Sequence, residues 1–322
     1  MTSDFDAQPP TGPVPTNVVP FPAPTSVLPP PVLGPGTPAD QGQLLTNALL
    51  ALWWGYGWQP GIGSGELGPQ ARPLNTAWMG FDPNRRYPRW GIPDAALALF
   101  AFLIGTVVFA FPTVLVTSDL GVLNIMGLLG SWVGAVAYLV FVSRVKGQGR
   151  LSLDFGFRAK WIDLPIGLGV AIVTLIASQI VRLAVAAVFD APVESNSDAI
   201  FSGQDSAAGV IILALMAAIG APIVEELLFR GLGQRSIDKR FGAVAGVVGS
   251  ALVFGLLHWQ PADAIGTSLS LVAGITTYGV IFAIADRWVG RLAPSITAHF
   301  LLNSMAAALT VSSYFSGTTF GK

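Results

Sequence analysis

The chain has 322 residues, of which 52% are hydrophobic and only 11% are charged, with a mean hydropathy of +0.62. Soluble domains carry about 25% charged residues, so this composition excludes a water-soluble protein and predicts a membrane protein. The net charge of −1 gives no basis for a nucleic-acid partner, and the absence of cysteine excludes disulfides, thiolate metal ligands and a cysteine nucleophile.

The N-terminal region precedes the first long apolar run. Residues 1–40 are rich in proline, threonine and valine, which predicts a disordered, extended tail. Residues 41–59 are short for a membrane span and carry Trp53, Trp54 and Trp58, and tryptophan is typical of the membrane–water boundary. We therefore expect residues 41–92 to form an interfacial helix and a basic linker.

Seven apolar stretches follow, each close to the roughly 20 residues that cross the hydrocarbon core. The chain is thus predicted to be an all-α, polytopic transmembrane helical bundle. Residues 93–206 hold the first membrane helices, residues 207–313 hold a second group, and residues 314–322 form a short tail. The seven stretches are 93–117, 122–143, 165–189, 207–230, 241–258, 264–285 and 291–313.

Charged residues alternate between the connections of these spans. Lys and Arg precede span one and follow spans two, four and six, whereas the other three loops carry only acidic charges. Because cytoplasmic loops carry the excess of Lys and Arg, we expect the N-terminus in the cytoplasm and the C-terminus outside. A multi-pass protein of the bacterial plasma (inner) membrane fits this pattern best.

Span four ends in a cluster of ionisable residues, which are costly inside a membrane and mark functional sites there. Glu225 and Glu226 point about 100° apart on a helix, and Glu226 lies four residues before Arg230, the order that favours an ion pair. This leaves Glu225 to face a cavity, while Pro222 removes a backbone hydrogen bond just upstream. Taken alone, the cluster also fits a group of charges at the membrane edge.

The two histidines of the chain both lie in apolar spans, each with a partner four residues away. Phe254 precedes His258 on span five, where the aromatic ring could limit the orientation of the imidazole. His299 precedes Asn303 on span seven, so that two hydrogen-bond donors share one helical face, as an oxyanion site requires. Separately, His258 also fits an interfacial residue, and His299 with Asn303 fits polar contacts between helices.

Together, the three segments resemble the three motifs of the CPBP family of intramembrane proteases. This is the group of CAAX prenyl protease 2 and of the bacteriocin-processing, abortive-infection and lysostaphin-resistance proteins. Its pattern is Glu-Glu-x-x-x-Arg, then Phe-x-x-x-His, then His-x-x-x-Asn on successive helices, and no motif position of this chain departs from it. The resemblance covers about residues 207–310 and makes 207–313 a CPBP-like catalytic core.

The resemblance implies an intramembrane endopeptidase, a hydrolase that acts on a membrane-associated protein or peptide in the lipid bilayer. It implies that Glu225 activates a water molecule with the help of His258, and that His299 and Asn303 stabilise the oxyanion. Glu226 and Arg230 are then structural supports of the site, as is Phe254. No cofactor is expected, although two histidines and a glutamate are also the ligand set of some catalytic zinc sites.

Two other functions stay open at this point. A catalytically silent scaffold or immunity-type binding protein would keep the motifs without turnover, and a proton-coupled transporter would use the same ionisable groups as a relay. The predicted topology also contains a conflict. It puts Glu225 near the cytoplasmic end of span four and His258 near the outer end of span five, so the two cannot meet if both helices cross straight through.

Overall fold

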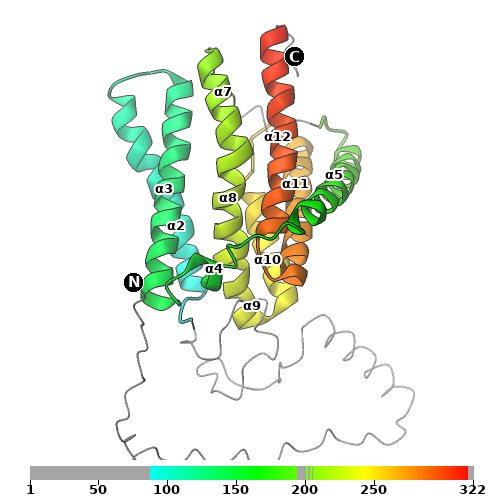
Figure 1. Cartoon of the computed structure of the whole chain (residues 1–322). Coiled ribbons are helices and arrows are strands. Elements are labelled where there is room, and N and C mark those ends of the chain that lie inside the picture. The colour runs from blue at the N-terminus through cyan, green and yellow to red at the C-terminus, as the bar shows by residue number, and fades with distance from the viewer. Residues whose placement is uncertain (1–87, 194–200, 202–203, 205, 318–322) are drawn as a thin grey trace, which may run out of the picture. The chain divides into compact units, whose positions relative to one another are not determined.

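The computed structural model describes residues 88–193, 201, 204 and 206–317. Helices are the only regular elements in this part of the chain, which confirms the predicted all-α fold (Figure 1). The predicted disordered tail and interfacial helix lie outside the described residues. The elements are α2 (Ile92–Val114), α3 (Leu120–Lys146), α4 (Leu151–Asp154), α5 (Asp163–Val188), α7 (Ala207–Leu215), η3 (Met216–Gly220), α8 (Ala221–Glu226), η4 (Leu227–Gln234), α9 (Arg235–Phe241), α10 (Ala243–Leu256), α11 (Ile265–Val289) and α12 (Ala293–Ser316).

Each of the seven predicted spans corresponds to a helix or a continuous helical column. Five of them are long and apolar enough to cross a membrane, so the chain is a multi-pass membrane protein. Helix α10 is shorter than these, and α12 is not among the five, so the count of seven spans is not confirmed. The five are 92–114, 120–146, 163–188, 207–241 and 265–289.

The fourth span is longer than predicted, and the fifth is shorter. Elements α7 to α9 form one column of 35 residues, which is about 50 Å long and has Glu225 next to its midpoint. Helix α10 begins beside α9 and has 14 residues, about 21 Å, against a hydrocarbon core of roughly 30 Å. His258 follows its last turn, so the end of a short helix reaches the middle of a long one. The conflict in depth is thereby removed.

Helices α2 and α3 form a hairpin with very close backbone contact. A Cβ atom added to Gly105 would lie 2.1 Å from the carbonyl oxygen of Gly130, and one added to Gly134 would lie 2.1 Å from that of Ala101. Small residues permit such approach between membrane helices, whose association depends on packing rather than on the exclusion of water. The outer faces of both helices expose large apolar side chains, as lipid-facing helices do.

Helices α5, α10, α11 and α12 pack together and carry the C-terminal part of the fold. Helix α11 approaches α10 closely at Gly279, where an added Cβ atom would lie 2.8 Å from Cα of Ala251 on α10. At the end of α11, Arg291 forms a two-pronged ion pair with Asp163, the first residue of α5. These contacts fix the start of α12, which carries His299.

The close contact between α2 and α3 predicts that one methyl group added at Gly105 lowers the stability of the protein. We expect Gly105→Ala to destabilise the protein by about 1–3 kcal/mol, because backbone rather than a flexible side chain must move. Gly169→Ala on α5 is the matched control, since no atom lies within 4 Å of its added Cβ, and alanine favours a helix over glycine. Thermal unfolding in lipid nanodiscs measures both. Equal melting temperatures for the two variants would contradict the close contact.

Candidate active site

The helical column that carries the glutamates contains two π-helical segments, one on each side of α8. In η3 the amide of Ala221 donates to the carbonyl of Met216, five residues back. If this pattern continued by one residue, the amide of residue 222 would donate to the carbonyl of Ala217. Residue 222 is a proline, which has no N–H. The side-chain nitrogen of Asn303 donates to that carbonyl instead, at 2.8 Å. Asn303 therefore joins α12 to this column at the point where the column's own hydrogen bond is missing.

Glu226 and Arg230 form the ion pair that their spacing predicts. Arg230 Nη1 lies 3.1 Å from Glu226 Oε1, and both side chains are fully buried. Three aromatic rings surround the guanidinium, whose Cζ lies 4.3 to 6.0 Å from the ring centres of Phe229, Phe254 and Phe282. The rings provide cation–π contacts, so the positive charge is stabilised by more than its carboxylate partner.

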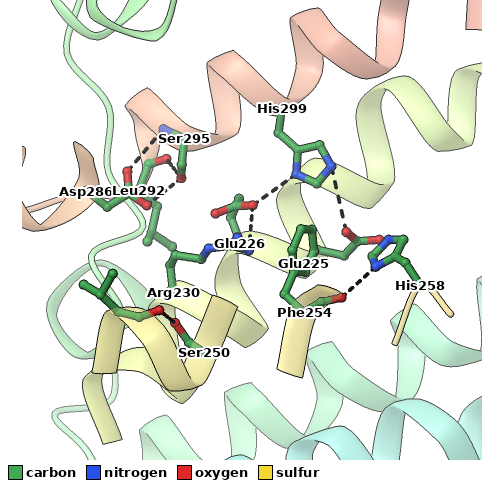
Figure 2. Close-up of polar contacts among 11 residues, drawn as sticks. Glu225, Glu226, Arg230, Ser250, Phe254, His258, Asp286, Leu292, Ser295 and His299 are labelled. Atoms are coloured by element: carbon green, nitrogen blue, oxygen red, sulfur yellow. Dashed lines mark hydrogen bonds and ion pairs between the residues drawn. The ribbon is translucent and has the colours of Figure 1, made fainter. Parts of the chain in front are cut away.

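His299 lies between the two glutamates. Its Nδ1 is 3.0 Å from Glu226 Oε1, and its Nε2 is 3.8 Å from Glu225 Oε2 (Figure 2). The first distance is a hydrogen bond, whereas the second is within the range of an ion pair but too long for a hydrogen bond. The two carboxylates leave the helix in different directions, as predicted, yet one imidazole contacts both through its two nitrogens.

His258 is held by the residue one turn before it. Its Nδ1 lies 2.8 Å from the carbonyl oxygen of Phe254, and the Phe254 ring meets the imidazole edge-on with centroids 4.8 Å apart. The same ring lies 6.1 Å from the ring of His299. Phe254 thus connects the two histidines, which come from different helices (Figure 2).

Glu225 has an unsatisfied carboxylate oxygen that faces the cluster. Its side chain is 15% exposed, but its Oε2 is buried and has no hydrogen-bond partner among the described residues. A buried carboxylate oxygen without a donor has capacity to accept a hydrogen bond. The arrangement therefore offers an acceptor next to the imidazole of His299, and an acceptor of this kind is what the activation of a water molecule requires.

The residues predicted from the three motifs come together from three different stretches of the chain. Asn303 is the partial exception, because its side chain donates to the carbonyl of Ala217 while His299, on the same helix, reaches toward the glutamates. An amide nitrogen has two N–H groups, so one bond to Ala217 leaves the second. The catalytic roles given to these residues stay predictions.

A second buried pair, Asp286 and Ser295, was not predicted from the sequence. The Oγ of Ser295 lies 2.5 Å from Asp286 Oδ2, and its backbone nitrogen lies 3.2 Å from Oδ1. Leu292, the residue before α12, has no capping side chain, so Asp286 of α11 satisfies an N–H in the first turn of α12. The available signal was the spacing of Ser295, which lies one turn before His299 on the same face.

Metal coordination was the alternative chemistry for the two histidines. Within the described part of the chain, no three or more His, Cys, Asp or Glu side chains form a group that could hold a metal ion. The two Nδ1 atoms are engaged with Phe254 and Glu226, respectively. The expected independence from metal stays a prediction.

Comparison with known proteins shows a similarity for the second group of helices. Residues 207–305 match the family model described as type II CAAX prenyl endopeptidase Rce1-like. The match confirms the resemblance that the three motifs indicate, and at the level of the family it assigns a peptidase. It covers less than half of the chain and includes every motif residue. No curated protein and no solved structure gives a significant match.

Phe254 contacts both histidines and Arg230, and this predicts a stabilising role. We expect Phe254→Leu to lower the free energy of unfolding by about 2 kcal/mol, because a desolvated cation–π contact is lost. Phe300→Leu is the control, since Phe300 is 40% exposed on α12. Thermal unfolding in nanodiscs measures both variants. If Phe254→Leu melts no earlier than Phe300→Leu, the aromatic contacts do not hold the cluster together.

Proposed function

We propose that this chain, whose residues 207–305 match the model of type II CAAX prenyl endopeptidases, hydrolyses a peptide bond of a membrane-associated protein or peptide. The observation that carries the proposal is the convergence of three motifs around Glu225. One imidazole lies 3.8 Å from its buried oxygen, and Phe254 connects that imidazole to the second one. Ionisable groups are costly inside a membrane span, so their convergence at one point favours a catalytic role over a role in helix packing.

Glu225 is the general base in this proposal, and His258 is its helper. The carbonyl of Phe254 can only accept a hydrogen bond, so the proton of a neutral His258 is on Nδ1. Its Nε2 then presents a lone pair. This atom can accept one hydrogen of a water molecule while Glu225 takes the other, which orients the water oxygen for attack.

The proposed reaction needs no covalent enzyme intermediate. Glu225 takes a proton from water, the oxygen adds to the carbonyl carbon, and the π electrons move onto the carbonyl oxygen. His299 and the second N–H of Asn303 donate to this oxyanion. Glu225 then gives the proton to the leaving nitrogen as the C–N bond breaks, which yields a carboxylic acid and an amine.

The proposed orientation in the membrane follows from the loop charges. The basic connections face the cytoplasm, which puts α9, with Lys239 and Arg240, on the cytoplasmic side. The C-terminus is then outside. We assign the chain to the plasma membrane of a bacterium, where the substrate approaches within or at the surface of the bilayer.

Replacing the proposed base tests the function directly. We expect Glu225→Gln to abolish specific cleavage, and to lower the rate on an identified substrate by about 10²–10⁴-fold, because an amide cannot take the proton. Mass spectrometry of the N- and C-terminal peptides of membrane proteins compares cells that carry the variant with cells that carry the wild type. Cleavage sites that vanish identify the substrate.

Asp119→Asn is the matched control for this experiment. Asp119 caps α3 through the amide of Val122, and asparagine caps a helix equally well, so the variant should cleave as the wild type does. All proteins must be expressed at the same level. Identical termini in wild-type and Glu225→Gln cells, together with a phenotype on deletion, would show a binding protein rather than a protease.

A chelator distinguishes the proposed chemistry from zinc catalysis. We expect the purified wild type to keep its cleavage rate after treatment with phenanthroline or EDTA, because Glu225 rather than a metal ion activates the water. A zinc enzyme would lose activity and regain it when zinc is added back. If activity is lost with the chelator and returns with added zinc, the metal alternative replaces the glutamate mechanism.

A further inference from the structure

The hydrogen bonds around His299 determine which of its nitrogens carries a proton. Glu226 Oε1 accepts from Arg230 Nη1, a group that can only donate, and the same oxygen lies 3.0 Å from His299 Nδ1. An ionised carboxylate can only accept, so Nδ1 is the donor in this contact. The proton of a neutral His299 is therefore on Nδ1, and its Nε2 has none.

This assignment conflicts with a neutral His299 as an oxyanion donor. The only nitrogen left to reach a substrate is Nε2, which faces Glu225 Oε2 at 3.8 Å. A bare Nε2 would oppose its lone pair to a carboxylate and could not donate to an oxyanion. A proton on Nε2 removes both difficulties. It faces the carboxylate of Glu225 in the resting enzyme and the oxyanion in the transition state.

We propose that Glu226 is a positioning residue that holds His299 as a doubly protonated cation, with its Nε2–H directed to the developing oxyanion. This inference deepens the proposed function and rests on it. Glu226 acts only through the imidazole. It accepts the Nδ1 proton, fixes the plane of the ring and supplies the negative charge that favours a cationic ring.

The charges around the ring are consistent with a cationic His299. Two carboxylates flank it, Glu225 and Glu226, and Arg230 pairs with the second. These three groups sum to one negative charge, and a proton on His299 brings the cluster to zero. From the remaining packed elements, the rings of Phe254 on α10 and Phe282 on α11 face the imidazole.

A cationic His299 also couples the two halves of the reaction. In the resting state the Nε2–H faces the negative charge of Glu225. When Glu225 takes the proton from water, its charge is neutralised, and in the same step the carbonyl oxygen becomes negative. The imidazolium exchanges one anionic partner for another without moving, which is the preorganisation that stabilises a transition state most effectively.

Two variants separate positioning from a purely structural role. In Glu226→Gln, Arg230 still requires an acceptor, so the amide oxygen keeps the place of Oε1 and the hydrogen bond to Nδ1, while the charge is lost. In the double variant Glu226→Leu with Arg230→Met, the acceptor and the guanidinium are both removed. Apolar replacement of a whole buried ion pair is often tolerated, so this variant should remain folded even though the cation–π contacts of Arg230 are lost.

The chain suits a direct measurement because it contains only two histidines. Nitrogen-15 NMR of the full chain, labelled at histidine and placed in lipid bilayers, distinguishes protonated from unprotonated ring nitrogens. His258→Gln and His299→Gln assign the signals. At neutral pH we expect one protonated and one unprotonated nitrogen for His258, and two protonated nitrogens for His299. In Glu226→Gln, we expect His299 to keep the proton on Nδ1 and to lose that on Nε2.

Kinetics on the identified substrate complete the test. We expect kcat to fall about 100-fold in both Glu226 variants with KM nearly unchanged, the loss expected for one oxyanion donor. An unprotonated nitrogen on His299 in the wild type would overturn the inference. So would a folded double variant with the wild-type kcat. A doubly protonated His299 in a chain that cleaves nothing would overturn the proposed function and leave the proton assignment standing.

Discussion

Two adjacent carboxylates near the midpoint of a membrane-length helix are the constraint around which the second half of the chain is arranged. Each buried ionised group costs several kcal/mol unless partners satisfy it. Glu226 receives Arg230 and His299, and Arg230 in turn receives three aromatic rings. Among the described residues, Glu225 has one partner at ion-pair distance, His299. Both partners of Glu226 contact its Oε1, whereas no hydrogen bond to Glu225 is found among the described residues, which leaves Glu225 able to react.

The predictions that succeeded from sequence concern residues on the same helix. The ion pair of Glu226 with Arg230 and the ring contact of Phe254 with His258 both follow from a spacing of four residues. The all-α fold follows from long apolar runs, which only helices or closed barrels can place in a bilayer. In each case the pattern is local, so the sequence contains it entirely.

Contacts between helices could not be predicted in the same way. Equal spacing on α12 suggested that His299 and Asn303 point to one target, whereas the first bonds Glu226 and the second bonds the carbonyl of Ala217. Span four is predicted to end at residue 230. In the fold, Arg235 is 1% exposed and donates to the carbonyl of Asp154. Tertiary partners let the helix continue to Phe241, and no local pattern shows them.

Because this column contains π-helical segments, the number of its residues matters as well as their identity. A π turn contains one residue more than the α-helix accommodates, so η3 sets the rotational phase of everything after it. Removal of one residue between Met216 and Gly220 would leave Glu225, His258 and His299 all present. It would also turn the glutamates by about 100° relative to the first half of the column. In this protein, therefore, spacing across a motif-free segment is as much a part of the active site as the motifs themselves.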